Sequence, residues 1–138
     1  MQISPFHLAV SVSDLKETRS FYIKNFNCEV GRETPEWVDL NFYGHQLVLH
    51  LDENKKNNNA EGKVDGHGVP VPHYGVVLDW NNWLKLKDQL EGDIDFIIEP
   101  YIRFKGQPGE QGTMFFKDPS GNTLEFKSFK DMTRLFAK

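Results

Sequence analysis

The chain has 138 residues, a formal charge of −4 and one cysteine. A chain of this length buries about two thirds of its unfolded surface, so we expect one domain that folds without disulfides. The scattered charges exclude the basic stripe that nucleic acid requires, and no run approaches the ~18 apolar residues of a membrane span or an apolar leader. We therefore expect a cytoplasmic protein whose partner is a small molecule, and no nucleic acid or membrane partner.

The first half of the chain has the pattern of one strand, one helix and three further strands. An apolar run over residues 5–12 predicts the first strand. Asp14 with Glu17 three positions later is the signature of a capping box, and it predicts a helix that continues to about Phe26. Residues Leu15, Thr18, Tyr22 and Phe26 share one helical stripe. Three strands are predicted over residues 28–33, 36–43 and 45–51, with Tyr43-Gly44 as the last turn.

The second half repeats this order after a polar stretch. Residues 53–70 show no periodicity, and we expect an exposed, mobile connector there. The next elements are a strand over residues 72–78 and a helix that Gly92 ends. Later strands are predicted near residues 95–100, 112–117 and 122–128, with Asp118-Pro119-Ser120-Gly121 as a turn and a short terminal helix over residues 129–137.

The two halves therefore predict an α+β fold built from two βαβββ modules. Module 1 covers about residues 1–52 and module 2 about residues 71–130, within a single domain over 1–138. Internal repetition supports this fold, because each module alone leaves one sheet face uncovered. We expect the mixed sheets to form a half-open barrel around one metal cavity.

Three residues at matching places in the two halves carry the chemistry. His7 and His73 each open the first strand of a half, and Glu125 lies on an apolar strand, where an unpaired carboxylate is costly to bury. Two imidazoles and one carboxylate hold a divalent metal and leave positions open for substrate. Fe(II) suits this set best, with Zn(II), Ni(II), Co(II) and Mn(II) as alternatives.

Three sequence segments resemble the vicinal oxygen chelate superfamily, which contains glyoxalase I, extradiol dioxygenases and bleomycin-resistance proteins. They are HLAVSVSD from His7 with Phe21-Tyr22, PHYGV from Pro72, and FFKDPSGNTLEF from Phe115. The resemblance covers nearly the whole chain, and the last segment is its most specific part. It implies paired βαβββ modules, a metal held by His7, His73 and Glu125, and a homodimer.

His50 distinguishes the possible chemistries. It ends the last strand of the first half, at roughly the place that Glu125 holds in the second half. By the resemblance it is either a fourth metal ligand, like a glutamate of glyoxalase I, or an acid/base beside the metal, like a histidine of extradiol dioxygenases. Gln46 shares its strand face, so it is a candidate substrate-binding residue.

Three further residues are candidates for substrate binding. Tyr101 and Arg103 fall in a predicted loop over residues 101–111, which is a candidate lid. Arg103 is suited to clamp a carboxylate or enolate through two parallel hydrogen bonds. Phe115 precedes the Asp-Pro turn on a strand where the resemblance to extradiol enzymes calls for a tyrosine, and Tyr101 or Tyr74 is a candidate to replace that hydroxyl.

Three functions remain open at this point. The first is a dioxygenase-like oxidoreductase, in which the metal binds vicinal oxygens of an organic substrate while His50 moves protons. The second is a glyoxalase I-like lyase or isomerase that acts through an enediolate, although the first half lacks the expected carboxylate. The third is a metal-free protein that sequesters a ligand, as bleomycin-resistance proteins do. We favour the dioxygenase-like enzyme.

Overall fold

The computed structural model describes residues 2–55, 60–64 and 67–138, and the side chains of 60–64 and 67 lie outside this description. The chain forms two compact units. Unit 1 consists of Met1–Asn58 with Asp118–Asn122, and unit 2 of Asn59–Lys117 with Thr123–Lys138. Within the described residues, neither long helix has the length and apolar character needed to cross a membrane.

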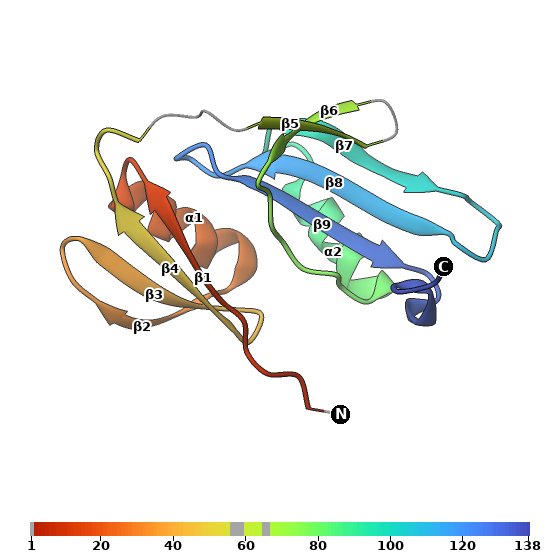
Figure 1. Ribbon diagram of the computed structural model, residues 1–138, viewed down its shortest axis with the longest axis horizontal. Helices are drawn as coiled ribbons and strands as arrows, with labels where there is room; N and C mark the ends of the chain where they lie inside the picture. The colour runs from red at the N-terminus through yellow and green to blue at the C-terminus, as the bar shows by residue number, and fades with distance from the viewer. Residues whose placement is uncertain (1, 56–59, 65–66) are drawn as a thin grey trace. The chain divides into compact units, whose positions relative to one another are not determined.

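Unit 1 is a four-stranded mixed sheet with one helix on one face (Figure 1). Its elements are β1 (His7–Val12), α1 (Leu15–Phe26), β2 (Glu29–Glu33), β3 (Trp37–Phe42) and β4 (His45–Leu51). The strand order is β1-β4-β3-β2, and β1 runs parallel to β4 while the other pairs are antiparallel. The predicted order of the first module is confirmed.

Local sequence signals explain the helix and the last turn of unit 1. The Asp14 side chain accepts a hydrogen bond from the Glu17 amide at 2.9 Å and so caps α1. Tyr22 packs its ring on Phe42 of the sheet. Tyr43 and Gly44 both have positive φ, 53° and 86°, which is the conformation of a two-residue hairpin turn that follows the sheet twist.

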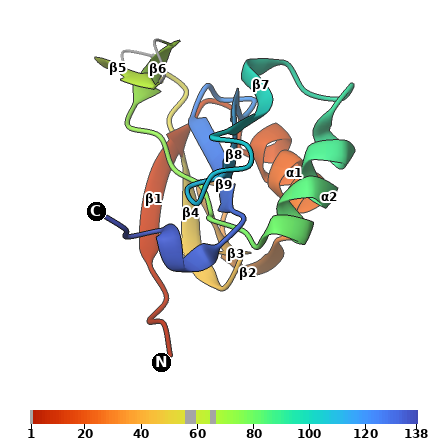
Figure 2. The same cartoon turned by 90° about the vertical axis from the view of Figure 1, so that its right-hand side faces the viewer.

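Unit 2 contains a hairpin, a helix, a three-stranded antiparallel sheet of order β7-β8-β9 and a final 3₁₀ turn. These elements are β5 (Ala60–Val64), β6 (His67–Val71), α2 (Trp80–Leu90), β7 (Phe96–Arg103), β8 (Gln111–Lys117), β9 (Thr123–Phe129) and η1 (Met132–Arg134). Helix α2 lies beside this sheet (Figure 2), and its Trp83 indole donates a hydrogen bond to the Phe126 carbonyl at 2.9 Å. The βαβββ order of the second module is thereby confirmed in outline.

The expected connector over residues 53–70 is wrong in its second part. Strands β5 and β6 pair antiparallel there, and Val69 is only 1% exposed. Val69 packs with Ile98 and Phe115 in a small apolar cluster. The strands are only five residues long, which gives a weak alternation signal, and packing of Val69 on Ile98 and Phe115 supplies support that an isolated hairpin lacks.

Two other elements are shorter than predicted. Residues 72–78 form no continuous strand, because they meet β9 only through parallel bridges at Tyr74–Leu124 and Val77–Lys127. Residues 129–137 contain only the three-residue η1, since β9 continues to Phe129. Pro72 explains part of the first difference, because proline has no amide hydrogen to offer a ladder.

The Asp118-Pro119-Ser120-Gly121 turn forms as predicted and belongs to unit 1. One oxygen of the buried Asp118 carboxylate accepts from the Ser120 and Asn122 amides, both at 2.9 Å. The other oxygen accepts from the Tyr22 hydroxyl at 2.8 Å and the Asn122 side-chain amide at 2.9 Å. Burial raises the pKa of Asp118, although these four donors act in the opposite direction.

Asp118→Asn is expected to lower the free energy of unfolding by about 2–3 kcal/mol. The substitution places an NH2 group where a carboxylate oxygen accepts two hydrogen bonds, so donors would face donors. Chemical denaturation monitored by tryptophan fluorescence measures the change. The matched control is Asp131→Asn, because the exposed Asp131 caps only the terminal η1. Equal losses in both variants would contradict a central role for the Asp118 turn.

Candidate metal centre

Two of the three predicted ligands contact each other within unit 2. The His73 Nε2 atom lies 3.2 Å from Glu125 Oε2, and the two side chains are 24% and 12% exposed. His73 lies at the start of the segment that runs parallel to β9, and Glu125 lies on β9 itself. The two donor atoms that a metal would use therefore face one another across this parallel pairing.

A glycine makes this close approach possible. A Cβ atom at Gly75 would lie 1.7 Å from the Glu125 carbonyl oxygen, which is far inside van der Waals contact. The Glu125 amide also donates a hydrogen bond to the Tyr74 carbonyl at 2.9 Å. Because only glycine fits at this position, residue 75 fixes the spacing between the His73 segment and β9.

The hydrogen bonds of both imidazoles occupy Nδ1 and leave Nε2 for another partner. His73 donates from Nδ1 to the Pro70 carbonyl at 2.9 Å. In unit 1, His7 donates from Nδ1 to Gln46 Oε1 at 2.7 Å. Metal-bound histidines typically donate their other ring N–H in this way, which fixes the tautomer and the ring plane. Each imidazole is therefore oriented as a metal ligand would be, and His73 with Glu125 fits part of a divalent-metal site.

The carboxylate of Glu125 is held through its other oxygen. Thr113 donates its hydroxyl to Oε1 at 2.9 Å, and the Lys127 ammonium lies 3.4 Å from the same atom. Oε2 is the oxygen that faces His73. Phe115 is fully buried, and its ring packs edge-on against the His73 imidazole at 5.1 Å between centroids. Thr113 and Lys127 were not among the residues identified from the sequence.

A hollow of about 240 Å³ opens beside this pair. It is lined by His73, residues 74–77, Glu125 and Lys127, all of which belong to unit 2. Across residues 2–55, 60–64 and 67–138, no group of three or more His, Cys, Asp or Glu side chains gathers as a metal ligand set. His73 and Glu125 therefore form a pair of candidate ligands in unit 2, whereas His7 belongs to unit 1.

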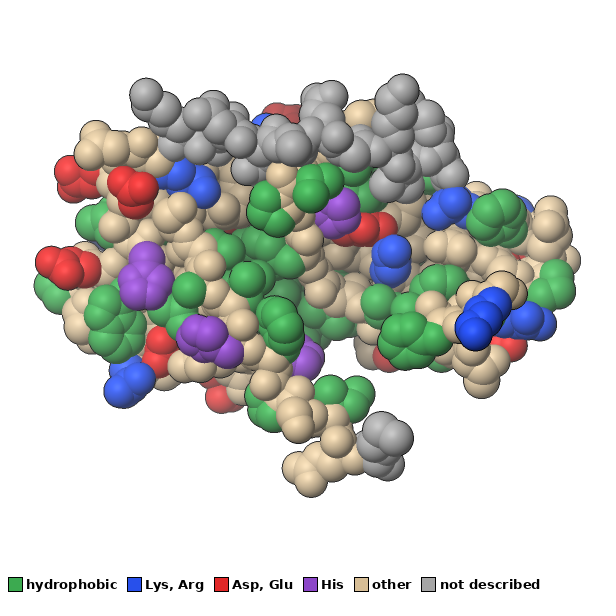
Figure 3. Space-filling model, in the orientation of Figure 1, with side chains coloured by type: hydrophobic (Ala, Val, Ile, Leu, Met, Phe, Trp, Pro, Cys, Tyr) green, Lys and Arg blue, Asp and Glu red, His purple; other side chains and the backbone are tan. Residues whose placement is uncertain are grey.

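Unit 1 presents its other candidates on the sheet face opposite α1. His7 pairs with Gln46 across β1 and β4, and His50 lies between Ser11 of β1 and Trp37 of β3. His7 and His50 are both exposed. Figure 3 shows histidine side chains at the surface over β1 and β4. Gln46 and His50 are four positions apart on β4, so they lie on the same face of the strand, as expected.

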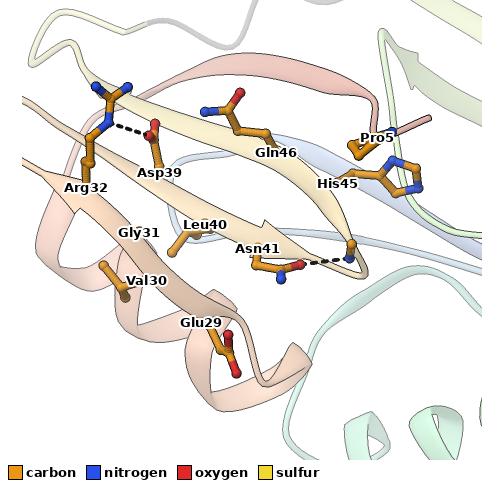
Figure 4. Close-up of a pocket in the computed structure, with 11 residues that line it drawn as sticks. Pro5, Glu29, Val30, Gly31, Arg32, Asp39, Leu40, Asn41, His45 and Gln46 are labelled. Carbon is orange, nitrogen blue, oxygen red and sulfur yellow. Dashed lines mark hydrogen bonds and ion pairs between the residues drawn. The ribbon is translucent and has the colours of Figure 1, made fainter.

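The same face of unit 1 carries a pocket of about 390 Å³ (Figure 4). Asp39, Asn41 and Gln46 line it, which agrees with the alternation seen in the sequence. Arg32 points toward Asp39, with Nε 3.5 Å from the carboxylate, and its guanidinium lies over the Trp37 ring. Sequence reasoning missed Arg32, because a β-bulge in β2 changes the alternation just there.

His50 does not occupy the position that matches Glu125. Leu8, which follows His7, pairs with Leu47, and Tyr74, which follows His73, pairs with Leu124. The residue after each leucine is then Val48 in the first half and Glu125 in the second. His50 instead matches Lys127, since Ser11 pairs with His50 as Val77 pairs with Lys127. The assignment from the sequence was wrong by two residues, which is one full strand repeat.

The predicted loop over residues 101–111 is shorter than expected. Tyr101 and Arg103 belong to β7, which ends at Arg103, so the connection covers only residues 104–110. Tyr101 packs against the apolar cluster that contains Val69, and the Arg103 guanidinium lies over the Phe104 ring at 5.0 Å. Glu110 stabilises this connection, because its side chain accepts a hydrogen bond from the Gly106 amide at 2.9 Å.

Both the sequence and the fold are similar to those of known proteins. The model of the glyoxalase/bleomycin resistance protein/dioxygenase superfamily matches residues 4–126. A glyoxalase/bleomycin resistance protein/dioxygenase from Alicyclobacillus acidocaldarius is 30% identical, with 96% of each chain covered and a TM-score of 0.77. This chain therefore belongs to the glyoxalase/bleomycin resistance protein/dioxygenase superfamily.

More distant solved structures share the fold. The fosfomycin resistance protein FosX from Listeria monocytogenes is 15% identical over 98% of each chain, with a TM-score of 0.65. A lactoylglutathione lyase from Agrobacterium tumefaciens is 18% identical over 98% of this chain and 97% of that one, with a TM-score of 0.59. No curated protein sequence matches this chain significantly.

Gly75→Ala is expected to lower the free energy of unfolding by about 2–3 kcal/mol, because the added methyl forces the 73–77 segment away from β9. Thermal and chemical denaturation measure the loss. The control is Gly109→Ala, since a Cβ at Gly109 meets no atom within 4 Å and its φ is not positive. If both variants were equally stable, the close approach at Gly75 would have no energetic importance.

Proposed function

We propose that this chain is a metal-dependent enzyme in which His7, His73 and Glu125 hold one divalent metal. The observation that carries the proposal is the shared hydrogen-bond pattern of the two imidazoles. Each donates from Nδ1 to an oxygen and leaves Nε2 for a metal, and one Nε2 lies beside Oε2 of a carboxylate. Two neutral imidazoles and one carboxylate make a facial set of three ligands with open positions.

The surrounding residues have defined tasks in this proposal. The metal, when bound, supplies Lewis-acid activation and open positions for vicinal oxygens of a small organic substrate. The Pro70 carbonyl and Gln46 hold the two imidazole tautomers. Thr113 holds one oxygen of Glu125 and leaves the other toward His73. Phe115 supports the His73 ring through their edge-on contact.

Dioxygenase-like chemistry with Fe(II) is the form of the proposal that we favour. Val48 occupies the position of the first half that matches Glu125, so that position offers no fourth ligand. A glyoxalase I-like lyase is expected to take a carboxylate from each half, and this chain lacks the first one. Fe(II) oxygenases use two histidines and one carboxylate and keep positions open for O2 and substrate.

His50 is proposed as the acid/base of the reaction. Its exposed imidazole lies on the same face of β4 as Gln46 and two residues beyond Val48. An imidazole beside a metal can take up or release a proton during the reaction without being a metal ligand. The proposal also includes a cytoplasmic location and a homodimer, and analytical ultracentrifugation tests the homodimer.

Protein purified anaerobically without an affinity tag is expected to contain about one metal ion per chain, mainly iron. His7→Ala, His73→Ala and Glu125→Gln should each lose most of the metal, because each removes a donor atom. Elemental mass spectrometry measures metal per chain, and circular dichroism confirms that each variant is folded.

His50→Ala is the informative companion variant in this measurement. Retained metal with lost turnover supports the acid/base role, while loss of zinc or nickel would favour a four-ligand, glyoxalase-like site. A wild-type protein that binds no added Fe(II), Zn(II), Ni(II), Co(II) or Mn(II) would overturn the enzyme proposal. The metal-free, ligand-sequestering function would then be the better explanation.

Gln46→Leu is expected to weaken metal binding by about tenfold or more, because residues that orient a ligand histidine typically contribute about 10–100-fold to metal affinity. Competition with a fluorescent chelator measures the affinity. Gln46→Glu is the matched control, since it keeps an acceptor oxygen for His7 Nδ1 and should retain or increase the affinity. An unchanged affinity in the leucine variant would mean that the His7–Gln46 hydrogen bond does not serve a metal.

A further inference from the structure

Lys127 introduces a positive charge beside the proposed metal ligands. Its ammonium lies 3.4 Å from Glu125 Oε1, its side chain is 34% exposed, and it lines the same hollow as His73 and Glu125. An ammonium has three hydrogen-bond donors, and Glu125 engages one of them. Lys127 thus contributes donors and charge to a cavity that is otherwise lined by residues 73–77 and Glu125.

Glu125 does not depend on Lys127 for its hydrogen bonding. Thr113 donates to Oε1 at 2.9 Å, which is closer than the lysine, and Oε2 lies 3.2 Å from His73 Nε2. A lysine next to a metal ligand also opposes cation binding, because like charges repel at this distance.

The register gives a second, independent observation. Lys127 matches His50 of the first half, as the residue two positions after the Val48/Glu125 position. In each unit, this strand position carries a nitrogen-containing side chain that can donate a hydrogen bond. A strand face of this kind is suited to a ligand that is negatively charged or becomes so.

We propose that Lys127 binds an anionic oxygen of the substrate, and that the site accepts small organic anions with vicinal oxygens. The inference rests on the proposed metal site and names its substrate class. A divalent metal, one carboxylate and one ammonium leave a net charge of about +2 beside neutral imidazoles, which favours a carboxylate or an ionised enol over a neutral diol. Lys127 is then a specificity-determining residue.

Two opposite effects of Lys127→Met test the proposal. The affinity for Co(II) should stay the same or increase, because a neighbouring positive charge is removed. The affinity of the Co(II)-loaded protein for oxalate should fall by about tenfold or more, because a charge-assisted hydrogen bond is lost. Isothermal titration calorimetry measures both affinities, with oxalate as a small dianion that offers two vicinal oxygens.

The controls separate this inference from the proposed function. Lys130→Met removes a lysine that pairs with Glu110 outside the hollow, at 3.6 Å, and should leave oxalate binding unchanged. Lys127→Arg keeps the charge and should retain most of the oxalate affinity. Weaker Co(II) and weaker oxalate binding together would overturn the inference, since Lys127 would then only position Glu125. Unchanged oxalate affinity in Lys127→Met would overturn it while leaving the metal proposal intact.

Discussion

The candidate metal centre depends on how closely the 73–77 segment approaches β9. Gly75 permits this contact, because any side chain there would collide with the Glu125 backbone. The contact aligns Tyr74 with Leu124, and this alignment brings His73 Nε2 to Glu125 Oε2. Two ligand atoms from residues 52 positions apart (125 − 73) are thereby set by backbone sterics rather than by attraction between the side chains. In the proposed metal centre, this pair is already in place without the ion, which would reduce the ordering required on binding.

The hydrogen bonds around the imidazoles then decide what this geometry can do. An imidazole that donated from Nε2 could not bind a metal through that atom. In both units an oxygen acceptor instead selects an imidazole that is protonated on Nδ1. The acceptor is the Pro70 backbone carbonyl for His73 and the Gln46 side-chain amide for His7. Different local structures therefore leave Nε2 available on both imidazoles. This agreement supports the proposed metal site more strongly than either histidine alone.

Much of the fold could be predicted from the sequence, because its signals are local. The Asp14 cap, the Tyr43-Gly44 turn and the Asp118 turn each act over a few residues. The β5–β6 hairpin and the interrupted 72–78 segment were missed, since they depend on pairing with distant strands and on a glycine packed against a backbone. The same holds for the site. The candidate ligands could be identified from the sequence, but only the strand register shows that His50 corresponds to Lys127 and not to Glu125.

The register also shows how two similar modules have diverged in their chemistry. Val48 and Glu125 occupy matching positions, so the first module has an apolar side chain where the second has a carboxylate. His50 and Lys127 also match, and both side chains can carry positive charge. Valine in place of a carboxylate leaves the first module with one negative charge fewer, while Lys127 gives the second module one positive charge more. In the proposed function, both differences favour a three-ligand metal site that attracts anions.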